Sequence, residues 1–335
     1  MYREAGTAAQ AVRDQLFANA QDMERLGEQL RLLAPRAVVT CARGSSDHAA
    51  TFAKYLIETR LGVLTSSAAP SVSSIYDTRP HLDNSVCLAI SQSGASPDLL
   101  AAVGKARESG AMVVALVNAK DSPLAGLADH VVPLCAGPEK SVAATKSFIA
   151  SLAAITHLVS CWAADQELSE EIRKAPRHLE RAWSLDWSAA VAHLQPAADL
   201  FVIGRGIGLG VAQEAALKLK ETCGLHAEAV SAAELRHGPM ALVRAGFPVL
   251  VFSQNDEARA GLEVLAAELA ARKADVMIAG SRCPGALNLA WEPAHPVIEP
   301  MLIAQAFYRM ANALSLARGL DPDRPPNLKK VTETV

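Results

Sequence analysis

Short apolar runs alternate with stretches of helical periodicity along most of the chain, which predicts strands separated by helices. Strands are expected over residues 37–41, near 63–66, over 86–90 and 112–117, and near 130–134, with helices over 47–60 and 97–109. A repeated order of strand, helix and strand implies a mainly parallel sheet that is covered by helices on both faces. The pattern therefore predicts an α/β protein.

Two further stretches have helical periodicity without strands beside them. Before Pro35 the chain is polar and amphipathic, which predicts one long or broken helix with apolar positions at Leu16, Met23, Leu26, Leu30 and Leu33. Residues 145–165 are apolar at helical spacing, and the charged, Trp-bearing segment 166–195 is interpreted as a connection to a second part of the chain.

The second part repeats the first. Arg-Gly at 43–44 recurs at 205–206, Ser-Gln at 91–92 recurs at 253–254, and the strand at 113–117 recurs near 276–280, all at an offset of about 162 residues. Matching offsets at separated places indicate a duplicated α/β unit. We therefore predict a helical segment over 1–35, a first domain over 36–165, a connection over 166–195, a second domain over 196–320 and a tail over 321–335.

Composition narrows the possible functions. Half of the 335 residues are hydrophobic and 4% are aromatic, and the net charge of −3 comes from interspersed charges. No basic face is available for nucleic acid or for an anionic membrane. No apolar stretch is long enough to span a bilayer, and the start of the chain lacks the apolar core of a secretory signal. We expect a cytoplasmic protein without nucleic-acid or membrane partners.

Cysteine usage fits that compartment. The six cysteines are scattered, without a C-x-x-C pair or a histidine at metal-ligand spacing, so they are interpreted as buried hydrophobes and no metal is expected. Cys41 stands beside a glycine loop where a nucleophile could lie, but no histidine can be assigned to activate it, and a core cysteine is favoured.

The strongest chemical signal is the sequence Ser-Gln-Ser-Gly-Ala-Ser at 91–96, directly after the buried strand over 86–90 and before a helix that begins near Pro97. Hydroxyl groups, an amide and the free N–H groups of a helix N-terminus meet there, which is typical of a phosphate site. An ordinary serine N-cap is the alternative. In the second copy the turn continues with acids at 256–257, which would repel a phosphate, so one phosphate site is expected in the N-terminal half.

Acidic and basic residues gather in the second half of the chain, within a segment otherwise rich in Ala and Leu. Glu214 and Lys218 form an i,i+4 pair of the kind found on solvated helix faces, and Lys218 with Glu221 could be the same. The density of such groups up to a histidine before Gly-Pro nevertheless favours general acid–base chemistry for Glu221 and His237. The Pro-rich tail is expected to run extended, with its lysine pair at 329–330 as solvated charge.

Taken together, these motifs resemble the tandem sugar isomerase (SIS) family, in particular the isomerase half of glucosamine-6-phosphate synthase. The likeness runs from about residue 36 to the end, through segments at 44–49, 91–94, 143–146, 216–221, 226–228, 234–239 and 326–330 in the same order. The resemblance implies two tandem doubly wound parallel-sheet domains of flavodoxin-like type.

The resemblance also implies roles for individual residues. Ser91, Gln92, Ser93 and Ser96 would bind the sugar phosphate, Ser45 and Ser46 would complete the pocket, and the backbone near Val142 and Ala144 would touch the sugar. Glu221 would move a proton between C1 and C2 with support from Lys218, His237 would open the ring from a neighbouring subunit, and Lys330 would form a Schiff base with a ketose. A homodimer with a shared active site and no metal or redox cofactor is implied.

The synthase carries an additional glutaminase half, which we do not expect in this protein. We therefore expect a deaminase/isomerase that converts glucosamine 6-phosphate into fructose 6-phosphate and ammonia. A fructosamine-6-phosphate deglycase is the alternative enzyme, and a non-catalytic sugar-phosphate sensor is the alternative of another class. Departures from the family pattern at Arg43, Ala95, Pro97 and Ala144 leave the substituent on the sugar open.

Overall fold

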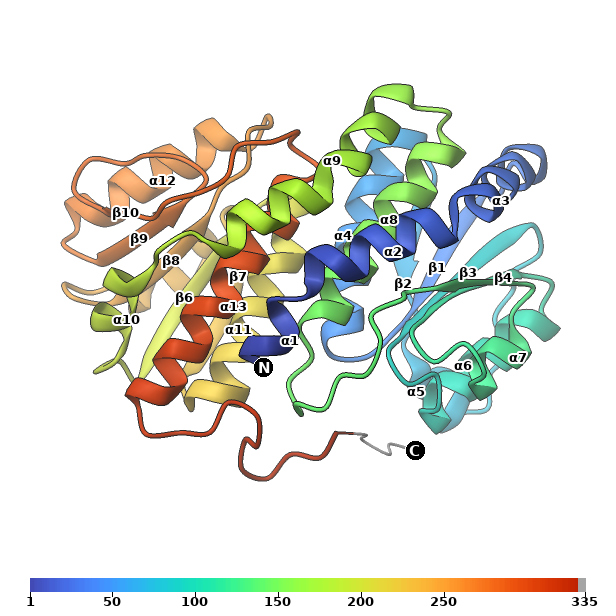
Figure 1. Cartoon of the computed structure of the whole chain (residues 1–335), viewed down its shortest axis with the longest axis horizontal. Coiled ribbons are helices and arrows are strands. Elements are labelled where there is room, and N and C mark those ends of the chain that lie inside the picture. Colours follow the sequence, from blue (N-terminus) through green and yellow to red (C-terminus); the bar gives the residue numbers. More distant parts are fainter. Residues whose placement is uncertain (331–335) are drawn as a thin grey trace. The chain divides into compact units, whose positions relative to one another are not determined.

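The computed structural model describes residues 1–330. It divides into two compact units. The first is made of residues 1–9, 140–145 and 175–328, and the second of 10–139, 146–174 and 329–330. Each unit contains one parallel sheet of five strands with helices on both of its faces (Figure 1). The predicted α/β class and its two parallel sheets are confirmed.

The sheet of the second unit has the strand order β2-β1-β3-β4-β5. Its strands are β1 (Ala37–Cys41), β2 (Leu64–Ser67), β3 (Ser85–Ser91), β4 (Met112–Val117) and β5 (His130–Pro133). Every residue of the central strand β3 is buried, as expected for a parallel strand between two helical layers. The helices α4 (Ser45–Leu61), α5 (Pro70–Ser74), α6 (Pro97–Glu108) and α7 (Pro123–Leu127) connect the strands.

The sheet of the first unit repeats this arrangement. Its order is β10-β9-β8-β6-β7, with β6 (Asp199–Gly204), β7 (His226–Ser231), β8 (Pro248–Phe252), β9 (Asp275–Ala279) and β10 (Leu287–Asn288). Numbered within each unit, both orders are 2-1-3-4-5, the doubly wound order of flavodoxin-like folds. The helices α10 (Ser188–Leu194), α11 (Leu209–Cys223), α12 (Arg259–Ala271) and α13 (Glu299–Ala317) belong to this unit, with the short turns η1 (Gly206–Gly208), η2 (Glu234–His237) and η3 (Pro239–Leu242).

The amphipathic N-terminal stretch is a broken helix, in three pieces: α1 (Tyr2–Ala5), α2 (Ala8–Ala18) and α3 (Ala20–Leu33). The buried side chain of Asn19 marks the second break and donates a hydrogen bond to the carbonyl of Pro133. The apolar stretch over 145–165 forms α8 (Lys146–Trp162), which packs on α3 at Gly27, where a Cβ would lie 2.6 Å from the Cys161 carbonyl carbon. The expected connection contains α9 (Gln166–Trp183).

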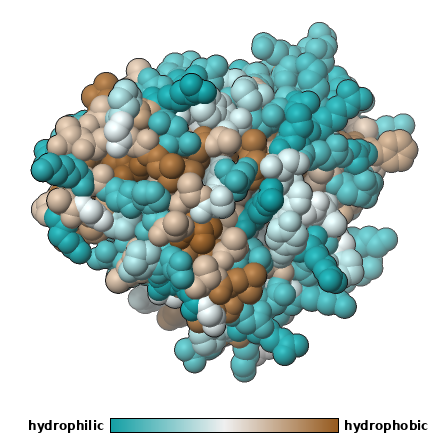
Figure 2. Space-filling model, turned by 60° about the vertical axis from the view of Figure 1, so that its left-hand side comes forward, coloured by the Kyte–Doolittle hydropathy of each residue, from teal (hydrophilic) through white to brown (hydrophobic). Residues whose placement is uncertain are grey.

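Hydrophilic residues surround smaller hydrophobic patches on the face that Figure 2 shows. Within residues 1–330, no helix combines the length and the apolar character needed to cross a bilayer. Cys41 lies in the core, and burial raises the pKa of its thiol, with the nearby Cys87 and Asp98 adding to the effect. A thiol with a raised pKa is a poor nucleophile, which supports the structural interpretation of this residue.

Candidate functional site

The predicted phosphate turn lies between β3 and α6. Ser91 ends the strand and accepts a hydrogen bond at its hydroxyl from the N–H of Gly94 (2.9 Å). The carbonyls of Ser91 and Gln92 accept from the N–H groups of residues 118 and 119, both at 3.3 Å, which ties the turn to the loop after β4. Ser96 occupies the N-cap position of α6, but its side chain makes no capping hydrogen bond. The hydroxyl of Ser96 therefore does not act as the ordinary cap that the alternative interpretation required.

A second loop lies beside this turn. Ser45 and Ser46 begin α4 after Gly44, which has a φ of +55°. Strands β1 and β3 are paired in parallel, with Cys41 opposite Ala89, so the loops that follow them emerge at the same edge of the sheet. Ligands of doubly wound sheets bind at this edge. All six predicted phosphate-pocket residues, in segments 45–46 and 91–96, are therefore on two adjacent loops of the second unit.

Gly94 gives the turn its shape. Its φ is +63°, and a Cβ at this position would lie 2.2 Å from the Oγ of Ser122. The carbonyl of Gly94 also accepts from the N–H of Leu124 (3.0 Å). A side chain at this position would force the turn away from the loop after β4.

Gly94→Ala is expected to lower the free energy of unfolding by about 1–3 kcal/mol, because the new Cβ meets both backbone strain and a steric clash. Denaturant unfolding measures the change. The matched control is Gly104→Ala, inside α6, the helix that follows the turn. A Cβ at Gly104 would meet no atom within 4 Å, and alanine has the higher helix propensity. Equal unfolding midpoints for the two variants would contradict the assigned role of Gly94.

The predicted base Glu221 and its neighbours Glu214 and Lys218 lie on α11 in the first unit. The side chains of Glu214 and Lys218 are each 1% exposed, with Lys218 Nζ 3.5 Å from Glu214 Oε1. Lys218 Nζ also lies 2.5 Å from Oε2 of Glu221, whose side chain is 20% exposed. The interpretation of Glu214 and Lys218 as a solvated surface pair is therefore wrong, because the face of α11 that carries them packs against α13 and the sheet.

Burial and charge oppose each other at Lys218. Burial alone would lower the pKa of this ammonium, but the carboxylates of Glu214 and Glu221 outweigh it, and the pKa is raised above its ordinary value. The hydroxyl of Tyr308 on α13 donates to Glu214 Oε1 at 3.0 Å. Lys218 is therefore a fixed cation that holds Glu221, the more exposed of its two carboxylate partners.

The remaining predicted residues are spread over both units. His237 lies exposed in η2 of the first unit, and within residues 1–330 no hydrogen bond or ion pair holds its ring. Val142 and Ala144 lie in the segment 140–145 of the same unit. The N–H of Val142 donates to the carbonyl of Asp323 (3.2 Å), and Val142 lines a pocket of about 850 Å³ together with Asp323 and Arg324 of the non-helical tail.

Lys330 belongs to the second unit, like the phosphate turn. Its Nζ lies 3.8 Å from Oε2 of the buried Glu139, which also accepts a hydrogen bond from the hydroxyl of Ser147 (2.6 Å). Glu139 and Tyr308 are the partners that sequence reasoning missed. Glu139 is a lone acid after Gly-Pro, and Tyr308 stands in an apolar helical run, so neither carries a local signal.

The turn of the second copy that corresponds to the phosphate turn is filled by its own side chains. Gln254 is buried and donates through Nε2 to the carbonyl of Arg205 (2.9 Å) and to Asp256 Oδ2 (2.8 Å). The other carboxylate oxygen of Asp256 accepts the N–H of Ala258 (2.9 Å). A carboxylate of the chain thus takes one backbone N–H and one side-chain amide that an anionic ligand could use.

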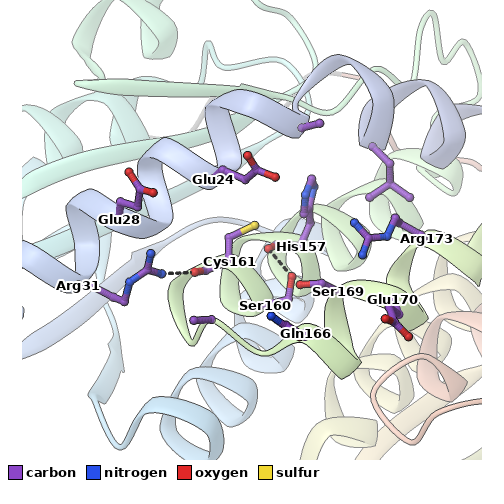
Figure 3. Close-up of a pocket in the computed structure, with 13 residues that line it drawn as sticks. Glu24, Glu28, Arg31, His157, Ser160, Cys161, Gln166, Ser169, Glu170 and Arg173 are labelled. Carbon is purple, nitrogen blue, oxygen red and sulfur yellow. Dashed lines mark hydrogen bonds between the residues drawn. The ribbon is translucent and has the colours of Figure 1, made fainter.

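A separate pocket of about 470 Å³ lies among α3, α8 and α9 in the second unit, and none of the predicted site residues lines it (Figure 3). His157 points into the space between these helices. Its Nδ1 has no hydrogen-bond partner among the described residues. Burial, with a smaller effect from the charge of Arg173, lowers the pKa of His157 to about 4.

Because the pKa of His157 is lower in the folded than in the unfolded state, its contribution to stability is complete above about pH 6.5 and is lost as the pH falls towards 4. His157→Gln should remove up to about 2–3 kcal/mol of this acid-induced loss. Urea unfolding at pH 4.5 and 7.5 measures it, with the exposed His81→Gln as control. The same pH dependence in wild type and His157→Gln would refute the assignment.

Comparison with known proteins places this geometry in a family. The model of the SIS domain matches residues 32–161 and 193–279, which hold the first sheet and the strands β6 to β9 of the second. The chain belongs to the SIS domain family. No group of three or more His, Cys, Asp or Glu side chains in residues 1–330 is arranged to hold a metal ion.

Relatives of this SIS protein include isomerising aminotransferases. It is 34% identical over 346 residues to glutamine–fructose-6-phosphate aminotransferase [isomerizing] of Methanothermobacter thermautotrophicus, an alignment that covers 98% of this chain and 56% of the relative. The corresponding protein of Aeropyrum pernix is also 34% identical, with 95% and 55% covered. The chain thus spans about half the length of these curated relatives.

Two solved structures match this chain over nearly the whole of their own length. A candidate phosphosugar isomerase from Silicibacter pomeroyi DSS-3 is 44% identical with a TM-score of 0.93, covering 96% of this chain and 99% of that one. The C-terminal domain of glucosamine-fructose-6-phosphate aminotransferase from Francisella tularensis is 26% identical with a TM-score of 0.87, covering 97% and 98%. Both matches extend over at least 96% of this chain.

Proposed function

We propose that this SIS protein is a glucosamine-6-phosphate deaminase that releases fructose 6-phosphate and ammonia by aldose–ketose isomerisation. The observation that carries the proposal is the pair on α11, in which the buried ammonium of Lys218 holds the accessible carboxylate of Glu221 at 2.5 Å. A single carboxylate that is fixed in place is suited to move a proton between adjacent carbons on one face of a sugar.

In the proposed reaction, His237 assists opening of the sugar ring, since an imidazole titrates near neutral pH and is suited to proton transfer. Glu221 then removes the proton from C2 of the open-chain aldehyde while O1 takes up a proton, which gives an enolamine. Glu221 returns its proton to C1 as the amino group gives up a proton. The product is an imine at C2. Water adds to this imine, the C2–N bond breaks, and fructose 6-phosphate and ammonia are released.

The phosphate would be held by the serine-rich turns of the second unit, where Ser45, Ser46, Ser91, Ser93 and Ser96 offer hydroxyls and Gln92 an amide. Val142 and Ala144 would touch the sugar through their backbone. Lys330 would form a Schiff base with the ketose, which forms a C=N bond at C2 and releases water. The family likeness supports a homodimer in which His237 reaches the neighbouring active site, and sedimentation would test it.

One of the similar structures carries the name of the proposed reaction. A structure called glucosamine-6-phosphate deaminase, from Thermotoga maritima, covers 98% of this chain and 100% of its own with a TM-score of 0.76. Its 21% identity supports a common fold, and its name supplies the reaction to be tested here. A sensor would need neither the buried Lys218 nor the carboxylate that it holds.

The test is to incubate the purified protein with glucosamine 6-phosphate and follow fructose 6-phosphate and ammonia together. Appearance of both in equal amounts is expected. Isomerisation without release of ammonia would support an isomerase and rule out the deaminase. If neither product appears, fructosamine 6-phosphates test the deglycase, with release of an amino acid and a hexose phosphate as the measured outcome.

A further inference from the structure

An arginine lies at the edge of the phosphate turn. Arg43 follows β1, and its Nε and Nη2 lie 2.8 and 2.7 Å from Oδ2 of Asp98. Asp98 stands in the first turn of α6, directly after Pro97, and its side chain is 0% exposed. The side chain of Arg43 is 52% exposed, so the guanidinium links a buried carboxylate to the surface of the turn.

The strand register places this arginine beside the serines. In the β1–β3 pair, Thr40 lies opposite Leu88 and Cys41 opposite Ala89. The same register continued by two residues sets Arg43 level with Ser91, the first residue of the phosphate turn. Arg43 is therefore located where the loop after β1 meets the turn after β3.

Charge balance at this edge favours a cation beside the neutral donors. A phosphate monoester carries about −1.5 to −2 charges at neutral pH, whereas the predicted contacts over 45–46 and 91–96 are neutral hydroxyls and an amide. The carboxylate of Asp98 would add repulsion. Apart from Arg43, the acid Asp47 and the histidine His48 are the charged or titratable groups of the neighbouring α4 turn.

The guanidinium of Arg43 has N–H donors that do not face Asp98 and are available to a ligand. A guanidinium carries five N–H groups in a planar fork that matches a phosphate. The N–H groups on Nε and Nη2 that face Asp98 fix the plane of the group, and the structure gives Nη1 no acceptor among residues 1–330. The bond to Asp98 also holds the side chain in one place, which reduces the entropy lost on binding.

We propose that Arg43 is the cation that binds the phosphate group of the substrate, and that Asp98 is the positioning residue that holds its guanidinium at the turn. The inference rests on the proposed function only for the kind of ligand, a sugar phosphate. The simpler alternative is that Arg43 does nothing more than neutralise the buried Asp98.

The test measures binding without turnover. Calorimetric titration uses glucitol 6-phosphate, which has no carbonyl group to react, and inorganic phosphate as a second probe. Arg43→Gln is expected to weaken binding of glucitol 6-phosphate by about 10- to 100-fold. The matched control is Arg205→Gln, which changes the arginine at the same place in the second copy, where the turn is filled by Gln254 and Asp256. No change is expected there.

A double variant separates binding from stability. Arg43→Gln removes the cation beside the buried carboxylate of Asp98, and the added change Asp98→Asn removes that buried charge. If Arg43 binds phosphate, the double variant regains stability to unfolding but not affinity. Recovered affinity in the double variant, unchanged affinity in Arg43→Gln, or an equal loss in Arg205→Gln would each overturn the proposal.

The outcomes also distinguish this proposal from the proposed function. Tight binding of glucitol 6-phosphate that depends on Arg43, without release of ammonia from glucosamine 6-phosphate, would reject the deaminase and keep the phosphate-binding arginine. If the protein is an active deaminase and Arg43→Gln leaves its KM for glucosamine 6-phosphate unchanged, the deaminase is supported and the role of Arg43 in phosphate binding is overturned. A wild-type protein that binds neither probe would overturn the role of Arg43.

Discussion

Glu221→Gln is expected to lower the turnover of glucosamine 6-phosphate by about 10²- to 10⁴-fold, the usual contribution of a positioned acid–base group. The amide keeps the size of the side chain and a hydrogen-bond acceptor for Lys218, but it cannot accept a proton from C2. Binding of the phosphosugar should stay within about threefold of wild type, because the phosphate contacts are on other residues. Steady-state kinetics and titration with glucitol 6-phosphate measure the two effects separately.

The control for this variant is Glu228→Gln, which changes an exposed glutamate on β7 in the same unit. Its turnover should equal that of the wild-type protein. Glu221→Asp provides a graded test, because the shorter carboxylate retains the chemistry but draws back from the substrate. If Glu221→Gln kept more than about a tenth of the wild-type turnover, another residue would have to be the base.

Lys218→Met is expected to destabilise the first unit by about 3–5 kcal/mol, the typical effect of removing one partner from a buried ion pair. Methionine has similar length and replaces the packing of the lysine stem, so the loss comes mainly from charge. Glu214 would be left as a buried carboxylate beside the hydroxyl of Tyr308, and Glu221 would lose its nearest cation. Denaturant unfolding at several pH values measures the effect.

The loss should shrink as the pH falls, since a protonated carboxyl group is less costly to bury than a carboxylate. Lys174→Met is the matched control, because Lys174 also pairs with a glutamate three residues away, at 2.7 Å, but on an exposed helix face. No measurable change is expected for it. Adding Glu214→Gln to Lys218→Met should restore part of the stability, and failure to do so would show that the buried charge is not the cause.

The two helical pairs show why local sequence could not separate them. Glu171 with Lys174 and Lys218 with Glu221 have the same spacing and opposite orders of charge. Exposure differs because α11 lies between the sheet and α13, and α13 is contributed by a stretch of chain some eighty residues further on. A solvated pair and a buried one are therefore indistinguishable until the helices are packed.

The sheet elements were predicted well from sequence, because their signals are local. The strand over 112–117 agrees residue for residue with β4, and the helix expected over 97–109 ends one residue later than α6. Boundaries shift where a polar turn residue joins an element, as Ser91 joins the end of β3 and Ser45 the start of α4. The internal repeat predicted a second α/β unit, and the structure shows that its sheet has the same strand order as the first.

Apolar periodicity and the duplicated motifs determined the α/β class and the two sheets, and the serine-rich sequence located the turn between β3 and α6. Each of these depends on neighbouring residues and on backbone geometry that short segments specify. Tertiary structure alone decided that Glu214 and Lys218 are buried and that Tyr308 donates a hydrogen bond to Glu214. It also decided that Glu139 lies beside Lys330 and that Asp98 holds Arg43. These contacts join residues distant in sequence, and the burial that sets their charge and proton affinity exists only after the elements have packed together.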